Sequence, residues 1–228
     1  QNFTAKYRAT LAGFDITATS QLTTLENGHR ELRFSASSWF AKIEEFSVLD
    51  WLQQGQLVPH RYEYHRTGLG RDRHAVLTFD WLKNRVVNNV QKKPWKMDVP
   101  SGVLDKLSVQ LQLRQDLINE RPLRDYQIAD GGRLKTYAFT LLQEEVIDTP
   151  LGKLNTVKIR RRQITNKEKT NKEKKIKRET TLWLAKDWDY LLVRLHRKEK
   201  DGKHYNIELD SATLADTPLI GLDTKPAS

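Results

Sequence analysis

Cysteine is the most informative absence in this chain of 228 residues, because none is present. A chain without thiols has no disulfide bonds, no thiolate nucleophile, no cysteine-ligated zinc and no iron–sulfur cluster. Long apolar runs are absent too, since no stretch approaches the roughly 18 apolar residues that a membrane-spanning helix needs. With 38% hydrophobic and 30% charged residues, the composition is that of a soluble protein with a sizeable core.

Familiar catalytic and metal-binding motifs are also lacking. The chain contains no His-Glu-x-x-His, no Gly-x-Ser-x-Gly, no phosphate-binding loop and no dinucleotide fingerprint. His60 and His65 have opposite parity on the strand expected there, which predicts that they lie on different faces. Glu44 and Glu45 are adjacent, so on a strand their carboxylates point opposite ways. We therefore predict no catalytic residue, no metal ligand and no cofactor.

The formal net charge of +10 is concentrated in one segment. Residues 158–178 hold eleven basic residues against Glu168 and Glu173, so the rest of the chain is close to neutral. A partner that responds to this charge would therefore meet one element rather than a whole surface.

Most of the chain shows the alternating pattern and turn residues of β-strands. Asn27-Gly28 and Asp201-Gly202 are typical hairpin turns. We predict a mainly β fold, a single curled antiparallel sheet or half-open barrel, because open sheets rarely exceed about 10 strands without curling. The expected organisation is one β-rich domain over residues 1–215, with a projecting basic hairpin at 156–184 and a loose C-terminal tail at 216–228.

One α-helix is predicted, over residues 103–119, with Ser101 as its N-terminal cap. Apolar residues cover more than half of its circumference, which predicts a largely buried helix. Lys106, Gln110 and Arg114 form one polar line within this apolar arc. One interpretation is that Lys106 and Arg114 reach water or pair with a sheet carboxylate such as Asp80.

The other interpretation is that this polar line faces a cavity. Lys106, Gln110 and Arg114 would then hold an anionic head group, and Leu107 and Leu111 would contact the apolar part of the same ligand.

The basic hairpin also has two interpretations. Its loop, TNKEKTNKEKK, has no apolar residue and is typical of a solvated segment. Alternatively, the hairpin contacts an anionic membrane surface or an acidic envelope protein. The candidate residues for this contact are Arg160, Arg162, Lys172, Lys174, Lys175 and Arg178. Arg161 is expected on the opposite face of its strand, and the lack of aromatic residues in the loop argues against nucleic acid.

Several phrases occur together in a recognisable order. They are Phe79-Asp80-Trp81, Gly102 with Asp105 and Leu107-Ser108, Leu111-Gln112-Leu113-Arg114, Thr149-Pro150-Leu151-Gly152, Thr156-Val157-Lys158, Arg178 with Thr180, Trp183-Leu184-Ala185 and Tyr190 to Leu195. From about Tyr7 to Leu209 the chain resembles a bacterial family of secreted proteins known only as a domain of unknown function. It departs from the family pattern at Leu192, where proline is more usual, and in its long lysine-rich loop.

The resemblance implies export to the periplasm of a Gram-negative cell and implies no activity, cofactor or catalytic residue. In plan the family is similar to the periplasmic lipoprotein carriers LolA and LolB, half-open barrels that hold acyl chains against an inner helix. Because the chain begins at Gln1, we expect that a signal peptide has been removed.

We therefore expect a non-enzymatic periplasmic binding or carrier protein for a lipid or another amphipathic ligand. The alternative is a structural or interaction module of the cell envelope that uses the basic hairpin. An envelope hydrolase is the least supported reading. The oligomeric state is left open.

Overall fold

The computed structural model describes residues 1–11, 14–68, 70–91, 93–164, 179–198 and 204–223. These residues form fifteen strands, one α-helix and a short 3₁₀ turn at Lys186–Trp188. The first eight strands are β1 (Phe3–Leu11), β2 (Phe14–Thr24), β3 (Arg30–Ser37), β4 (Lys42–Trp51), β5 (Leu57–Thr67), β6 (Arg73–Asp80), β7 (Arg85–Val90) and β8 (Lys93–Asp98). After the helix α1 (Ser108–Ile118) come β9 (Asp125–Asp130), β10 (Arg133–Thr149), β11 (Gly152–Ile164), β12 (Glu179–Ala185), β13 (Leu191–Lys198), β14 (His204–Leu214) and β15 (Thr217–Pro218).

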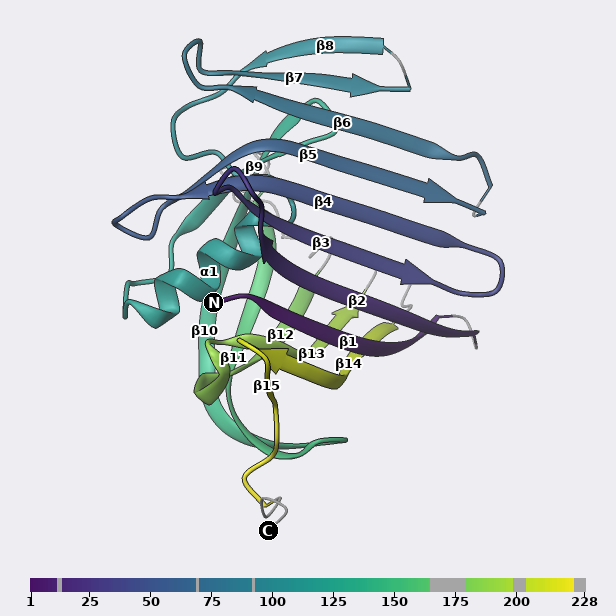
Figure 1. Ribbon diagram of the computed structural model, residues 1–228, viewed down its shortest axis with the longest axis vertical. Coiled ribbons are helices and arrows are strands. Elements are labelled where there is room, and N and C mark those ends of the chain that lie inside the picture. The colour runs from purple at the N-terminus through teal and green to yellow at the C-terminus, as the bar shows by residue number, and fades with distance from the viewer. Residues whose placement is uncertain (12–13, 69, 92, 165–178, 199–203, 224–228) are drawn as a thin grey trace, which may run out of the picture.

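The strands form one antiparallel sheet in the order β8-β7-β6-β5-β4-β3-β2-β1-β14-β13-β12-β11-β10-β9, with β15 beside β14. Figure 1 shows this sheet curling around α1, so that the two halves of the molecule face each other across the helix. The ladder between described residues ends at β8 and β9 and does not close into a barrel. The prediction of a curled antiparallel sheet with one main helix is therefore confirmed.

The two sheet edges are joined by other contacts. After β8 the chain crosses to β9, where the backbone of Leu104 bonds to Gln127 and Ala129 at 2.9 and 2.8 Å. We call the line where the β8 edge and the β9 edge approach each other the seam. Near it, Asn88 Oδ1 of β7 accepts the N–H of Gly132, in the turn after β9, at 3.2 Å. The segment that begins the helix thus also covers an edge that would otherwise expose unpaired backbone groups.

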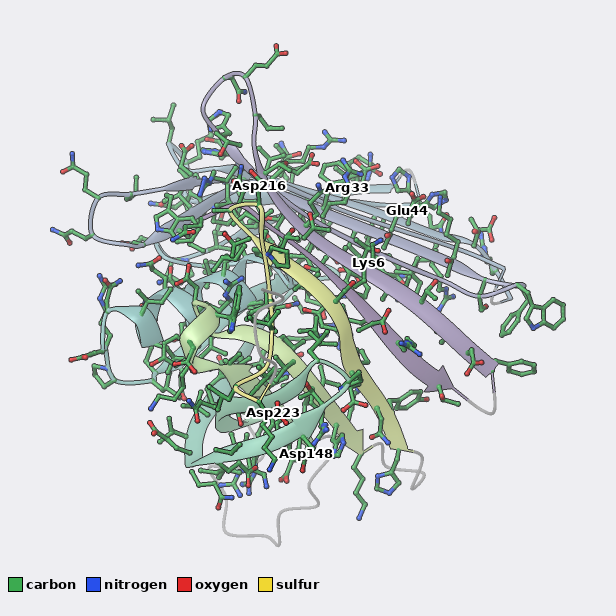
Figure 2. All side chains as sticks on the ribbon, turned by 60° about the horizontal axis from the view of Figure 1, so that its bottom comes forward. Lys6, Arg33, Glu44, Asp148, Asp216 and Asp223 are labelled. Atoms are coloured by element: carbon green, nitrogen blue, oxygen red, sulfur yellow. The ribbon has the colours of Figure 1, made fainter. Side chains whose placement is uncertain are left out.

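Strand alternation gives the sheet an apolar inner face and a charged outer face. In β1, for example, Phe3, Ala5 and Tyr7 are buried. Figure 2 labels three residues of the outer face, Lys6, Arg33 and Glu44, on strands β1, β3 and β4.

The helix is shorter than predicted, and a different residue caps it. Residues 103–107 precede the first helical turn, and Leu104 pairs with Ile128 as a parallel bridge. Asp105, rather than Ser101, takes the capping role: its Oδ1 accepts the N–H groups of Leu107 and Ser108 at 2.8 and 2.9 Å. The Ser108 hydroxyl in turn accepts the N–H of Asp105 at 2.8 Å, which completes a capping box.

The polar side of the helix is buried as well as the apolar side. Ser108, Gln112 and Asp116 lie outside the apolar arc of the predicted helix, yet they are at most 1% exposed. Gln112 accepts the N–H of Leu57 at 2.8 Å and donates to the carbonyl of Gly55 at 3.0 Å. The helix therefore supplies hydrogen bonds to the β4–β5 turn, whose backbone groups have few partners in the sheet.

The C-terminal segment differs from the loose tail expected at residues 216–228. β15 pairs with β14, and Leu219 is buried. Gly221 and Leu222 donate backbone hydrogen bonds of 2.8 Å to Leu151 and Lys153, and Figure 2 shows Asp223 beside the hairpin that carries Asp148. Backbone hydrogen bonds and the buried side chain of Leu219 provide this anchoring. Residues 224–228 lie outside the described residues.

Candidate functional site

A cavity of about 460 Å³ lies between the inner face of the sheet and the first turns of α1. Such a volume falls within the ordinary range of small-molecule sites, roughly 300–1,000 Å³. Much of its wall is apolar and comes from both halves of the sheet: Phe34, Ile43, Leu77, Leu192, Leu195 and Ile207. A smaller hollow of about 80 Å³ adjoins it farther along the helix and shares Tyr7, Val109 and Gln110 with it.

The helix brings the five predicted ligand residues to these two spaces. Lys106, Leu107 and Gln110 line the large cavity. Gln110, Leu111 and Arg114 line the smaller hollow.

Lys106 pairs with a sheet carboxylate, but the partner is Asp130 and not Asp80. Lys106 Nζ lies 3.0 Å from Asp130 Oδ1, and Lys135 contacts the other oxygen. Burial alone would raise the pKa of Asp130, but the two ammonium groups outweigh it and hold this pKa below its ordinary value. The two lysines carry two positive charges and Asp130 carries one negative charge. This group of three residues therefore leaves one net positive charge at the cavity wall.

Arg114 is partly buried, and no carboxylate among the described residues pairs with it. Its Nε donates to the carbonyl of Asp189 at 2.8 Å, and its guanidinium carbon lies 4.6 Å from the ring centre of Phe3. Burial lowers its pKa to about 10. These contacts make Arg114 an anchor between the helix and the β12–β13 turn, with one side on the smaller hollow.

Arg161 is the residue that the sequence analysis did not select. It lines both spaces, and its guanidinium lies 5.3 Å from the ring centre of Tyr137. Its hydrogen-bond partner is Thr180, at 3.4 Å, and no carboxylate among the described residues pairs with it. Burial lowers its pKa below the usual arginine value. The sequence signal that could have identified Arg161 as a cavity residue is the alternation of Val157, Ile159 and Arg161, which puts all three side chains on the inner face of the sheet.

A buried carboxyl group completes the polar wall. Glu45 lines the cavity, and the hydroxyl of Tyr62 donates to it at 2.6 Å. Burial raises the pKa of Glu45 above its ordinary value. Glu45 therefore loses its proton at a higher pH than a solvated glutamate does.

The hairpin residues predicted to contact an anionic partner fall into two groups. Arg160 and Arg162 lie on the outer face of β11, and Arg162 Nε is 3.4 Å from a carboxylate oxygen of Glu179. The strands of the hairpin, β11 and β12, pair as predicted. Lys172, Lys174, Lys175 and Arg178 lie outside the described residues.

The cavity and the hairpin ends share one end of the sheet. The antiparallel register places the C-terminal ends of β1, β3, β5, β7, β9, β11 and β13 at this end. Figure 1 shows several of these strand ends together at the right. The exposed residues Arg73 and Gly131 are among the lining residues, so the cavity meets solvent here. Phe14, Trp39 and Phe40 form an aromatic cluster at the same end, with ring centres 5.1–6.1 Å apart and Trp39 82% exposed.

No helix in the described part of the chain combines the length and apolarity needed to cross a bilayer.

Comparison with known proteins gives a family and a fold. A sequence model of the family described as "Protein of unknown function (DUF3108)" matches residues 3–210. No curated protein matches the sequence. Among solved structures the chain is similar to a β-barrel-like protein of domain of unknown function DUF1849 from Brucella abortus, with a TM-score of 0.63, 9% identity, and 95% of this chain and 98% of that chain covered.

Two further structures show weaker likeness. One is a candidate lipoprotein from Parabacteroides distasonis, with a TM-score of 0.37, 13% identity and coverage of 93% and 95%. The other is described as an exported protein with a YmcC-like fold from Bacteroides fragilis, with a TM-score of 0.34, 11% identity and the same coverage. At such identities the comparison with the Brucella protein concerns the fold alone.

Proposed function

The chain belongs to the DUF3108 family of proteins of unknown function, in agreement with the resemblance found in its sequence, and we propose that it is a non-enzymatic binding or carrier protein for an anionic amphipathic ligand. The observation that carries this proposal is the cavity of about 460 Å³, with apolar walls and the cationic side chain of Arg161 facing it. Following the family resemblance, we place this activity in the periplasm.

The proposed ligand lies along the helix. Its head group contacts Arg161, Lys106 and Gln110, and its apolar part lies against Leu107 and reaches toward Leu111 and Arg114 in the smaller hollow. Burying each methylene of the ligand contributes about 0.8 kcal/mol, so the apolar part of the ligand supplies most of the binding affinity. The charge at Arg161 selects the orientation and the sign of the head group.

The cavity wall supports binding better than catalysis. A hydrolase acting through general acid–base chemistry needs two convergent groups with separate roles. The carboxyl groups lining this cavity, within the described residues, are Glu45 and Asp130. Asp130 is paired with two lysines, and Glu45 accepts a hydrogen bond from Tyr62. With these partners, the two carboxyl groups do not form the acid–base pair that would activate a water molecule.

The charge at Arg161 is tested by replacing it with methionine, which keeps the length of the side chain. The Arg161→Met variant should bind a fluorescent long-chain fatty acid about 10- to 100-fold more weakly, because a hydrogen bond to a charged group contributes about 1.5–3 kcal/mol. Its affinity for the methyl ester of the same acid should change little. Fluorescence titration of both probes gives the two dissociation constants.

Arg162→Met is the matched control, because this neighbouring arginine lies on the outer face of the same strand. It should leave both dissociation constants unchanged. A wild-type protein that binds neither probe contradicts the proposal, as does an equal loss of affinity in the two variants.

A second candidate function is an interaction module that docks its open end on an anionic surface. The exposed aromatic cluster at that end favours it, as does the charge of the basic hairpin, whose strands end there. The predicted contact residues are Arg160, Arg162, Lys172, Lys174, Lys175 and Arg178. Docking is compatible with the carrier role.

A further inference from the structure

Three potential metal ligands meet on the outer face of the sheet, at the end opposite the cavity mouth. His29 Nδ1 lies 2.5 Å from Asp50 Oδ1, and His60 Nε2 lies 2.7 Å from Asp50 Oδ2. One donor atom from each of the three side chains falls within 4.8 Å of the other two. Their side chains are 35–38% exposed, so the group is supported by the sheet and open to solvent.

The three residues come from three adjacent chain segments. His29 directly precedes β3, Asp50 is in β4 and His60 is in β5. The register pairs Arg30 with Leu49, so His29 comes opposite Asp50 across the β3–β4 ladder. The sheet therefore fixes the positions from which all three side chains project.

A β-bulge places His60 in the group. Val48 pairs with Arg61 and Leu49 pairs with Pro59, which leaves His60 as the extra residue of β5. A regular ladder would put His60 opposite Leu49, whose side chain is completely buried. The bulge instead directs it to the outer face beside Asp50, a use of bulges that is common next to functional sites. It also puts His60 on the same face as His65, contrary to the parity prediction.

From this arrangement we infer that His29, Asp50 and His60 form a binding site for a divalent transition-metal ion of the Zn²⁺ type. Two imidazole nitrogens and one carboxylate are a ligand set that Zn²⁺ accepts, with water in the fourth position of an open site. Tetrahedral bonds of about 2.0–2.2 Å put ligand atoms roughly 3.3 Å apart. The carboxylate oxygens of Asp50 lie closer than that to the two imidazole nitrogens, at 2.5 and 2.7 Å, so the side chains would have to rotate apart to admit an ion.

The surroundings of Asp50 favour a cation. Its carboxylate faces two imidazoles, one on each oxygen. Each ring can present a neutral nitrogen to a metal ion and keep its proton on the other nitrogen. The ion would then replace the two hydrogen bonds with shorter metal–ligand bonds.

A neighbouring histidine group lacks these properties and serves as a control. His65 and His74 lie on the same outer face with ring centres 5.5 Å apart, and His74 Nε2 is 2.9 Å from Glu63. Glu63 is also paired with Arg61 at 2.7 Å. The guanidinium charge occupies this carboxylate and opposes a second cation there.

The test is calorimetric titration of the full-length, untagged, chelator-treated protein with ZnCl₂. We expect one Zn²⁺ per chain, and a loss of at least about tenfold in affinity in Asp50→Asn and in His60→Gln, since each removes one ligand. His74→Gln should bind as the wild type does. Circular dichroism of each variant shows that the fold is retained.

A second measurement is independent of affinity. Co²⁺ added in place of Zn²⁺ should give visible absorption bands of a four-coordinate ion in the wild type and in His74→Gln but not in His60→Gln. Failure of the wild-type protein to bind Zn²⁺ overturns the inference. Equal binding by the wild type, Asp50→Asn and His60→Gln overturns it too, because the ion would then lie elsewhere.

Discussion

Glu45 is a carboxyl group whose proton the fold helps to retain. Burial raises the pKa of Glu45 in the folded protein above its unfolded value, so the folded state binds the proton more tightly. By linkage, stability then falls as pH rises from the unfolded pKa to the folded pKa. Replacing the ionisable group with an amide should remove that loss.

The Glu45→Gln variant keeps an oxygen that can accept from the Tyr62 hydroxyl. We expect it to be as stable as the wild type near pH 4 and more stable at pH 7, where the wild type must ionise a buried group. Urea unfolding at the two pH values gives the free energies to compare. Glu44→Gln, on the outer face and paired with Lys42, should show no such gain; a gain of equal size there would refute the assignment.

The face on which a side chain lies was predictable from the sequence where strand alternation alone decides it. The alternation of Val157, Ile159 and Arg161 was visible in the sequence and placed Arg161 on the face opposite to Arg160 and Arg162, but it did not show that this face borders a cavity. His60 was not predictable, because a bulge shifts parity and no local signal marks it. The burial of Gln112 and Asp116 was not predictable for another reason. Helical periodicity shows that these positions are polar, but it does not show which groups elsewhere in the chain will hydrogen-bond to them.

The helix α1 illustrates how an element's start depends on partners elsewhere in the chain. The apolar periodicity begins at Val103, but Leu104 bonds to β9 and keeps the chain extended up to Asp105. Asp105 also accepts a hydrogen bond from Ser47 of β4 at 2.6 Å. The existence of the helix was therefore readable from the sequence, while its first residue was set by contacts that the sequence does not display.

Asp105→Ala should destabilise the protein by about 2–3 kcal/mol, because it removes a cap and leaves buried donors without an acceptor. Chemical denaturation measures this change. Ser101→Ala, at the residue first expected to be the cap, should cost less than about 0.5 kcal/mol, as is usual for an exposed position. A larger loss in Ser101→Ala than in Asp105→Ala would contradict the capping arrangement.

At the scale of the whole molecule, the two ends of the curled sheet are chemically different. One end is occupied by α1, and the other has the cavity mouth, the aromatic cluster and the ends of the basic hairpin. The curl was predictable from the number of strands, and the charge was predictable from composition. The gathering of Phe14, Trp39 and Phe40 was not, because it requires the register of two hairpins.

The open end should dock on anionic membranes. Vesicles that contain phosphatidylglycerol should sediment the protein at low ionic strength, and binding should weaken as salt is added, because salt screens the charge. Trp39→Ala and replacement of residues 166–175 by Gly-Ser should each weaken it severalfold. Leu82→Ala is the control, because Leu82 is fully exposed in a turn at the other end of the strands. Equal binding to neutral vesicles would exclude recognition of anionic lipid. Binding to a purified envelope protein and to no vesicle would exclude a membrane as the partner.

The seam between β8 and β9 gives this architecture a place where it can widen. Elsewhere, separating two neighbouring strands breaks a whole row of backbone hydrogen bonds, but here the described contacts are the Asn88–Gly132 bond, the packing of Trp95 on Gly132 and the crossing segment before the helix. Parting the sheet along this line would therefore break fewer backbone hydrogen bonds than parting any two paired strands. If the protein carries ligands as proposed above, this edge is where the wall would move to admit a wider ligand while the remaining strands stay paired.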